Sequence, residues 1–332
     1  MVLPSGNAIL FIFISNRGKI MNKDNDKVIF LNSPLREMIW GGNYFKDVLN
    51  LAKDDKDYGE YWTISGYSSF PSIIKNGKYQ GVSLDKLYKE HHELFANSNS
   101  DEFPILVKMI ATSADLSVQV HPDDEYAKKD NDLGKTESWL IINSNNGKIV
   151  YGHNQKDKES LEKMARSGDF SFLKYHNVKR GNFVPVPAGT IHALGKGLVL
   201  LEVQQSSNLT YRLYDYNRKD KNGNLRELHL DKSLDVIKVP NDLTIDDTDY
   251  LDSRDDVELW NNEYFNIKLV NVPRKIRFMN KEHKYYLCTV ASGLFRYEDM
   301  IISVGESFIV TSLAETEEIV GKGKLLIVES YR

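Results

Sequence analysis

The stretch L-S-V-Q-V-H-P-D-D-E-Y-A-K-K-D-N-D-L-G-K-T-E, residues 116–137, decides how the rest of the chain is interpreted. Its first six residues alternate strictly between apolar and polar side chains, which is typical of a β-strand with one buried face. Gln119 and His121 therefore project side by side, and Pro122 ends the strand because it has no N–H for the ladder. A Gln-x-His pair with a glutamate not far behind predicts part of a metal site.

Short segments of β character, broken by glycine, recur along the chain of 332 residues. Many short strands at close spacing are typical of barrels and sandwiches, so we predict a mainly β fold. Helical spacing is confined to short stretches. One covers 157–167 and ends before Gly168, and a second covers 225–236.

The best boundary between domains is a polar, acidic segment around residues 241–257, which we interpret as a solvated linker. It separates a predicted catalytic domain over 21–240 from a C-terminal β-barrel over 258–332. The first twenty residues contain an apolar run that is too short to span a bilayer and lacks the basic start of a signal peptide. We expect residues 1–20 to be a poorly ordered or non-native extension, with Met21 as the natural start.

Composition excludes several classes of function. The net charge of −4 provides no global basic field for nucleic acid. The single cysteine, Cys288, allows neither an internal disulfide nor a cysteine-rich zinc module, and its apolar surroundings predict a small buried side chain. We predict a cytoplasmic protein whose partners include neither nucleic acid nor a membrane.

Four side chains are candidate metal ligands: Gln119, His121, Glu137 and His192. His192 follows a Pro-Ala-Gly turn, which reverses the chain tightly and places this histidine on the next strand. Two histidines and one glutamate are a known catalytic zinc set that leaves room for water or substrate. Gln119 would add a neutral oxygen without adding charge.

The segment that ends at His192 resembles the second cupin motif, G-x5-P-x-G-x2-H, through Gly181, Pro187, Gly189 and His192. The first cupin motif contains His-x-His with a glutamate soon after, and here it is altered to Gln119-Val-His121. The literal spacing of that motif selects Glu125 as the carboxylate ligand. The choice between Glu125 and Glu137 stays open on spacing alone.

A closer resemblance covers most of residues 28–218. It is carried by Y-W-T-I-S-G-Y (61–67), F-P-I-L-V-K (103–108), Q-V-H-P (119–122), G-K-T-E (134–137), P-A-G-T-I-H (187–192) and Y-R-L-Y-D-Y (211–216). In these segments the chain resembles the type I mannose-6-phosphate isomerases, which are zinc-dependent cupin enzymes, in their short bacterial form.

The resemblance implies two cupin-type (jelly-roll) β-barrels with a few short helices, the second barrel without metal. It implies one Zn²⁺ per chain, and it selects Glu137 over Glu125 as the carboxylate ligand beside the glutamine and the two histidines. The family reaction interconverts mannose 6-phosphate and fructose 6-phosphate through an enediol. Such a reaction needs a proton carrier and a cation near the developing negative charge.

The resemblance also implies catalytic roles for Arg212 and Lys135, both of which are candidates for binding the substrate. Glu202, on the polar face of the predicted strand 198–204, is a second candidate for proton transfer. Ser117 shares the face of the ligands and is a candidate for hydrogen bonding to phosphate or sugar. The identity of the base and of the phosphate ligands stays open.

Two other functions are alternatives. Two histidines and a carboxylate also suit the non-haem iron of a cupin oxygenase, although Lys135 and Arg212 indicate an anionic substrate. The second alternative is a non-catalytic sugar-phosphate binder. In the main interpretation the partner is a small sugar phosphate, and the chain is a monomer or a weak homodimer.

Overall fold

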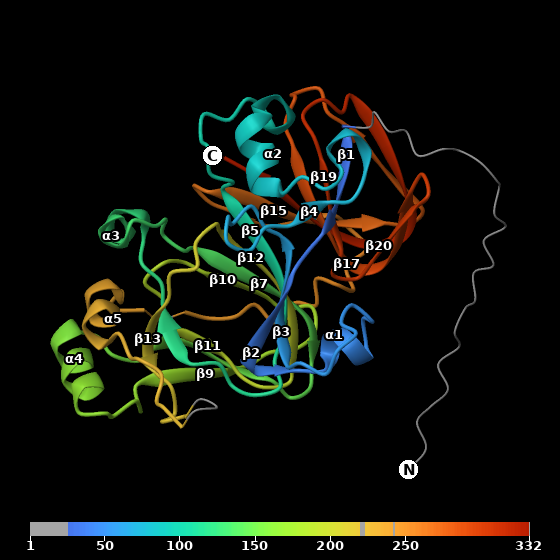
Figure 1. Ribbon diagram of the computed structural model, residues 1–332. Coiled ribbons are helices and arrows are strands. Elements are labelled where there is room, and N and C mark those ends of the chain that lie inside the picture. Colours follow the sequence, from blue (N-terminus) through green and yellow to red (C-terminus); the bar gives the residue numbers. More distant parts are fainter. Residues whose placement is uncertain (1–25, 220–222, 242, 332) are drawn as a thin grey trace, which may run out of the picture.

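The computed structural model describes residues 26–219, 223–241 and 243–331, and the expected extension over residues 1–20 lies outside them. Strands dominate the described chain, and its longest helix, α4, has nine residues. Figure 1 shows the helices at the periphery of the strands. The prediction of a mainly β fold with a few short helices is confirmed.

Two sheets form the half of the molecule that contains residues 116–137. The six-stranded sheet runs in the order β10 (Phe183–Val186), β7 (Glu137–Ser144), β12 (Leu198–Gln205), β5 (Ile105–Ala111), β3 (Tyr58–Ile64) and β2 (Leu35–Gly42). The five-stranded sheet runs in the order β13 (Tyr211–Tyr214), β6 (Val118–Val120), β11 (His192–Leu194), β8 (Lys148–His153) and β9 (Leu173–Asn177). One apolar cluster, with Ile110 and Trp139 from the first sheet and Tyr151 and Leu194 from the second, joins them.

Strand β12 lies at the centre of the six-stranded sheet, and all eight of its residues are buried. Leu201 and Val203 belong to the core shared with the C-terminal strands, whereas Leu200 belongs to the cluster shared with the five-stranded sheet. Because side chains alternate along a strand, Glu202 lies on the same face as Leu200. The polar side chains of β12 therefore lie between the two sheets of the N-terminal half.

The third sheet has nine strands. Its main path runs β14 (Val257–Asn261), β15 (Phe265–Val272), β20 (Thr316–Ser330), β17 (Tyr286–Tyr297), β19 (Ser307–Val310), β1 (Val28–Asn32) and β4 (Ile73–Ile74), with β16 (Lys275–Met279) on β20 and β18 (Met300–Ser303) on β17. The first described strand, β1, thus lies in the sheet of the C-terminal strands, next to β19 (Figure 1). Ile29 of β1 is opposite Ile309 of β19.

The strand pairs among the described residues leave the three sheets open rather than closed into barrels. The two-barrel detail and the division of the chain into domains therefore stay predictions. The acidic segment before β14 packs against the N-terminal half: Asp247 pairs with Lys179 and Asp249 with Arg180, each at 2.8 Å. Cys288 is buried, as the sequence predicts.

The α-helices are α1 (Tyr44–Asp47), α2 (Leu84–Glu90), α3 (Asp124–Ala127), α4 (Lys158–Arg166) and α5 (Leu230–Val236), and short 3₁₀ turns cover Gly77–Tyr79, His92–Phe95 and Lys128–Asp130. The predicted helix over 157–167 is confirmed, and Asp157 caps it by accepting a hydrogen bond from the backbone N–H of Ser160. The predicted helix over 225–236 is wrong in its first half, because α5 begins at Leu230.

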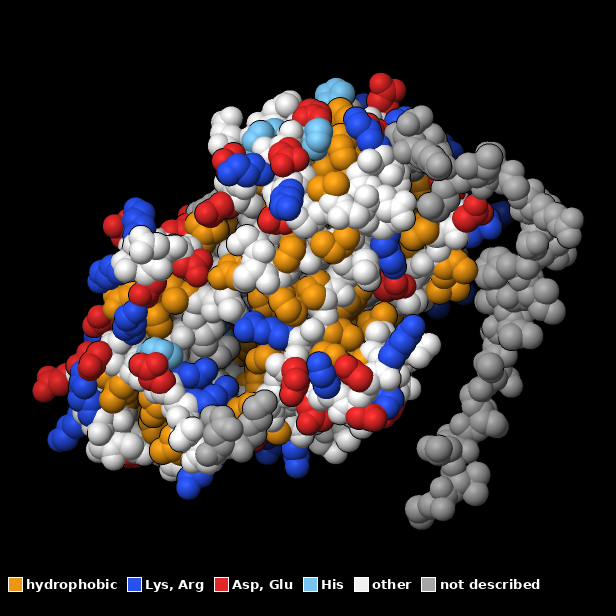
Figure 2. Space-filling view, in the orientation of Figure 1, with side chains coloured by type: hydrophobic (Ala, Val, Ile, Leu, Met, Phe, Trp, Pro, Cys, Tyr) orange, Lys and Arg blue, Asp and Glu red, His pale blue; other side chains and the backbone are white. Residues whose placement is uncertain are grey.

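Helices in the described part of the chain are all too short or too polar to cross a membrane. Figure 2 shows positive and negative side chains intermixed on the visible face, with hydrophobic side chains between them. This distribution agrees with the small net charge of −4.

Candidate metal centre

His121, Glu137 and His192 meet between the five- and six-stranded sheets, and each is at most 2% exposed. Nε2 of His121 lies 3.3 Å from Oε2 of Glu137, and Nε2 of His192 lies 3.5 Å from Oε1 of the same carboxylate. Ligand atoms about 2.0–2.1 Å from a tetrahedral zinc ion lie about 3.3–3.4 Å from one another. The three side chains are therefore spaced as a zinc site requires.

Strand pairing brings the fourth candidate ligand to the cluster. Gln119 on β6 is directly opposite His192 on β11, and its side-chain amide nitrogen lies 3.3 Å from Nε2 of that histidine. The Pro-Ala-Gly turn is tied to the end of β6, since the N–H of Gly189 donates to the carbonyl of His121 at 2.8 Å. Gly189 has a φ of +86°, which favours glycine at this position of the turn.

A hydrogen bond from Nδ1 to a backbone carbonyl orients the ring of each histidine. Nδ1 of His121 lies 2.9 Å from the carbonyl oxygen of Leu209, and Nδ1 of His192 lies 2.9 Å from that of Thr190. Donation from Nδ1–H leaves the lone pair of each Nε2 atom directed at the cluster. Burial lowers the pKa of both rings, that of His121 to about 3 with the charge of Lys135 contributing. Neutral imidazoles are the form that binds metal.

Glu137 begins β7 and is ionised in this environment. Burial by itself raises the pKa of its carboxyl group, but the positive charge of Lys135, with the adjacent ring of His121 contributing, outweighs burial and holds the pKa well below its usual range. Its buried Oε2 atom accepts no hydrogen bond of good geometry from the residues that the structure describes, although Nζ of Lys135 lies 2.9 Å away. A buried carboxylate oxygen with spare acceptor capacity fits a metal ligand.

The structure separates the two glutamates between which motif spacing left a choice. The side chain of Glu125 is 84% exposed in helix α3, where it pairs with Lys128. Glu137 is 1% exposed and contacts both histidines. Of these two carboxylates, only Glu137 is placed to share a metal ion with His121 and His192.

A buried network of charged groups adjoins the cluster. Nζ of Lys108 on β5 lies 3.0 Å from Oε1 of Glu202 on β12. The indole N–H of Trp139 donates to Oε1 of Glu137 at 3.1 Å and to Oε2 of Glu202 at 3.2 Å. Burial and the charge of Glu137 raise the pKa of Glu202, although Lys108 opposes this shift. Trp139 thus joins a candidate ligand to a candidate for proton transfer.

Arg212 and Ser117 lie beside the cluster, at the open part of the same site. Arg212 on β13 is opposite Gln119 on β6, and its Nε–H donates to Oγ of Ser117 at 3.3 Å. A second guanidinium N–H donates to the carbonyl of Glu227 at 2.7 Å. A cavity of about 270 Å³ connects these groups. Its charged lining residues are Arg36, Glu60, Lys108, Lys135, Glu137, Glu202, Arg212 and Arg226.

Residues 28–169 match the family described as phosphomannose isomerase type I, catalytic domain. A mannose-6-phosphate isomerase of Streptococcus mutans is 47% identical over 214 residues, which are 64% of this chain and 68% of the relative. The chain belongs to the type I phosphomannose isomerase family. The resemblance seen in the sequence is thereby confirmed.

Solved structures of phosphomannose isomerases share the fold. The mannose 6-phosphate isomerase of Bacillus subtilis superposes with a TM-score of 0.82 at 36% identity, over 91% of this chain and 99% of that one. A mannose 6-phosphate isomerase bound with zinc and yttrium superposes with a TM-score of 0.73 at 14% identity, over 92% and 99% of the two chains. At that identity the second match shows the common fold only.

In this member of the family, the site residues expected from the sequence all lie at one place. Gln119, Lys135 and Glu202 line the same cavity as Arg212 and Ser117. The sequence analysis did not select Lys108, Trp139, Glu60, Arg36 and Arg226, which line it too. One signal was available for Lys108: a lysine inside the apolar run F-P-I-L-V-K-M-I must find a buried partner.

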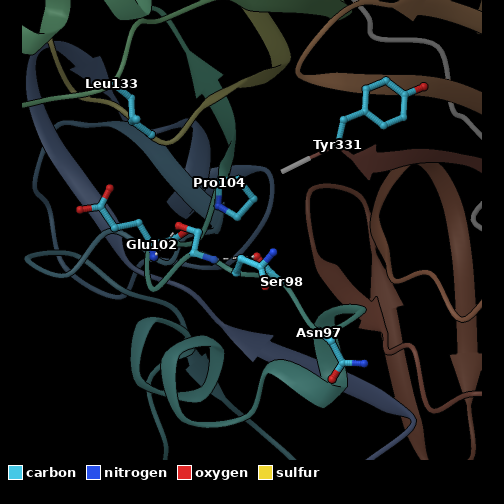
Figure 3. A pocket seen from close by; sticks show the side chains of 8 residues that line it. Asn97, Ser98, Glu102, Pro104, Leu133 and Tyr331 are labelled. Atoms are coloured by element: carbon cyan, nitrogen blue, oxygen red, sulfur yellow. Dashed lines mark hydrogen bonds between the residues drawn. The ribbon is translucent and has the colours of Figure 1, made fainter.

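A second cavity, of about 510 Å³, is larger than the one at the metal centre. Figure 3 shows labelled side chains of residues 97–104 around it, with Leu133 and Tyr331 on either side. Glu102 is the one charged side chain among its described lining residues, which include no histidine. The groups that acid–base or metal chemistry needs are instead gathered between β6, β7 and β11.

Proposed function

We propose that this protein is a zinc-dependent isomerase that interconverts mannose 6-phosphate and fructose 6-phosphate. The observation that carries the proposal is the buried His121–Glu137–His192 cluster, which has the spacing of a zinc site and contacts Lys135 within a charged cavity. Membership of the type I phosphomannose isomerase family names the reaction.

The ligand set we propose for one Zn²⁺ per chain is Gln119, His121, Glu137 and His192. Zinc bound there supplies a Lewis acid for a reaction in which negative charge develops on the sugar oxygens. The site with zinc bound would carry a net positive charge, because only one of the four ligands, the carboxylate, is charged. Trp139 fixes the carboxylate orientation through its hydrogen bond to Glu137.

The reaction removes a proton from C2 of the aldose and returns it at C1 of the enediol. Arg212, which is half-buried, provides a fixed cation for the charge that develops on oxygen. Ser117, held by Arg212, offers a hydroxyl group to the sugar or its phosphate. These roles follow from the position of both side chains on the wall of the cavity.

Two side chains are candidates for carrying the proton. Nζ of Lys135 lies 3.1 Å from Nε2 of His121 and 2.9 Å from Oε2 of Glu137, so it is adjacent to the proposed ligand atoms. Both oxygens of Glu202 are occupied, one by Lys108 and the other by Trp139. Geometry therefore favours Lys135 as the proton carrier and Glu202 as a residue that orients its neighbours.

A coupled assay tests the proposal by following fructose 6-phosphate formed from mannose 6-phosphate. We expect turnover that a chelator abolishes and that added Zn²⁺ restores. Absence of turnover by the zinc-loaded protein would contradict the proposed reaction. Turnover that survives complete removal of zinc would contradict the proposed metal requirement.

The same two histidines and glutamate also form the ligand set of non-haem iron oxygenases. The cations that line the cavity and the family membership favour a sugar phosphate and an isomerase. Metal analysis of protein purified without added metal distinguishes the two, because stoichiometric iron with O₂ uptake would support the oxygenase. A cytoplasmic monomer or weak homodimer remains part of the proposal.

A further inference from the structure

The cations that line the cavity differ in how their charge is compensated. Lys108 pairs with Glu202 at 3.0 Å and Lys135 with Glu137 at 2.9 Å, so each lysine is matched by a carboxylate. Arg36 lies 3.8 Å from the carboxylate of Glu60 and donates weakly to Asn208. Next to the proposed metal ligands, positive and negative side chains are therefore balanced.

Positive side chains outnumber negative ones where β13 and the segment before α5 meet. Asp215 is 4% exposed, and its carboxylate accepts hydrogen bonds from both Arg218 and Arg226, with Nε of Arg226 at 2.7 Å. Arg212 adds a third guanidinium group, which donates to Ser117 and to the Glu227 carbonyl and, within the described residues, to no carboxylate. Three arginines surround one buried carboxylate, and the carboxylate of Glu227, which also acts on Arg212, is 82% exposed to solvent. Positive charge is therefore in excess here.

Arg226 and Arg212 are the members of this group that line the cavity. Asp215 occupies Nε and one terminal nitrogen of Arg226, while the other terminal nitrogen makes no hydrogen bond with the described residues. The side chain of Arg226 is 20% exposed and lines the cavity, so it can meet a ligand there while Asp215 continues to hold it. The charge of Arg226 also contributes to lowering the pKa of Arg212, after the larger effect of burial.

We propose that Arg226, held in place by Asp215, binds the phosphate group of the sugar phosphate beside Arg212. A phosphate monoester carries about −1.5 to −2 charges at neutral pH and accepts hydrogen bonds from guanidinium groups in a fork geometry. Its negative charge complements the excess of positive charge at the three arginines. The reacting carbons of the sugar would then lie near Glu137, where the charges of the side chains are balanced. This inference rests on the proposed isomerase function and adds a specificity residue to it.

Steady-state kinetics of the zinc-loaded variant Arg226→Gln test the inference. We expect KM for mannose 6-phosphate to rise about tenfold or more, because a charge-assisted contact to phosphate is lost. The inhibition constant of inorganic phosphate should rise by a similar factor, while kcat falls much less and bound zinc is retained. The variant keeps the Asp215–Arg218 pair, so the fold of this segment is preserved.

Arg218→Gln is the matched control. It also removes one guanidinium group from Asp215, but Arg218 does not line the cavity, so we expect KM to change less than about threefold. An unchanged KM in Arg226→Gln, or an equal rise in Arg218→Gln, would overturn the inference. If the wild-type protein does not convert mannose 6-phosphate at all, the proposed function fails instead, so the two failures are distinguishable.

Discussion

Lys108 and Glu202 form an ion pair that is almost completely withdrawn from water, with side chains 4% and 5% exposed. They are direct neighbours in the ladder between β5 and β12. A buried pair of this kind contributes little net stability over apolar residues, yet loss of one partner leaves an uncompensated buried charge. The pair therefore constrains which substitutions this part of the site tolerates.

We predict that Lys108→Met lowers the free energy of unfolding by about 3–5 kcal/mol, since Glu202 is left buried without its cation. The double variant Lys108→Met/Glu202→Gln should recover a large part of that loss, because no unpaired charge remains. Urea denaturation of the two variants measures the difference. Equal destabilisation in the single and double variants would contradict this account of the pair.

The assignment of the carboxylate ligand is tested by two matched substitutions. We expect Glu137→Gln to lose zinc and activity together, because the charged donor between the two histidines disappears. Glu125→Gln should keep both, since Glu125 is exposed on α3, where it pairs with Lys128. Zinc content and turnover of the purified variants are the measurements. Loss of metal in Glu125→Gln would instead support Glu125 as the carboxylate ligand, as the literal spacing of the cupin motif selects.

Arg212 is expected to act on the reaction rather than on the metal. Arg212→Gln removes the fixed cation and should lower kcat by about 100-fold or more, as removal of a group that stabilises developing charge does. Zinc content should stay at the wild-type level, since the guanidinium group contacts Ser117 and the Glu227 carbonyl rather than a proposed ligand. A normal kcat would remove Arg212 from the catalytic residues.

The two candidates for proton transfer differ in a measurable way. With mannose 6-phosphate deuterated at C2, we expect Lys135→Met to abolish exchange of the label with solvent, because Nζ is adjacent to the proposed ligands. Glu202→Gln should retain slow exchange, since both carboxylate oxygens already serve Lys108 and Trp139. Bound zinc is measured in both variants, so that loss of metal is distinguished from loss of the base. If Lys135→Met exchanges the C2 deuterium at the wild-type rate, Lys135 is not the proton carrier.

Local pattern predicted much of the fold, because alternation and capping are properties of neighbouring residues. The strand that carries Gln119 and the helix that follows Asp157 formed where the sequence indicates. The failure at 225–229 has a tertiary cause. Leu225 bridges to Lys219, and the N–H of His229 donates to the carbonyl of Arg212, so these contacts hold the segment outside a helix.

The candidate ligands were found from sequence because each belongs to a short motif that resembles the family. Glu202 was also selected from sequence, but its ion pair with Lys108 was not, since the two residues are 94 positions apart and become neighbours only through the pairing of β5 with β12. The same holds for Arg226, whose contact with Asp215 depends on the fold of the chain between β13 and α5. Side chains that meet across strands or loops leave no local pattern in the sequence.

The pairing of β1 with β19 has a consequence for folding during synthesis on the ribosome. Val28 is translated 282 residues before its partner Val310 (310 − 28). At about 5–20 residues per second, roughly 15–60 s separate the two events. During that interval the edge of the apolar run V-I-F-L that pairs with β19 must stay unpaired or be shielded by a chaperone, although β4 can already pair with the other edge. Slowed translation of the segment that contains β19 should therefore promote aggregation.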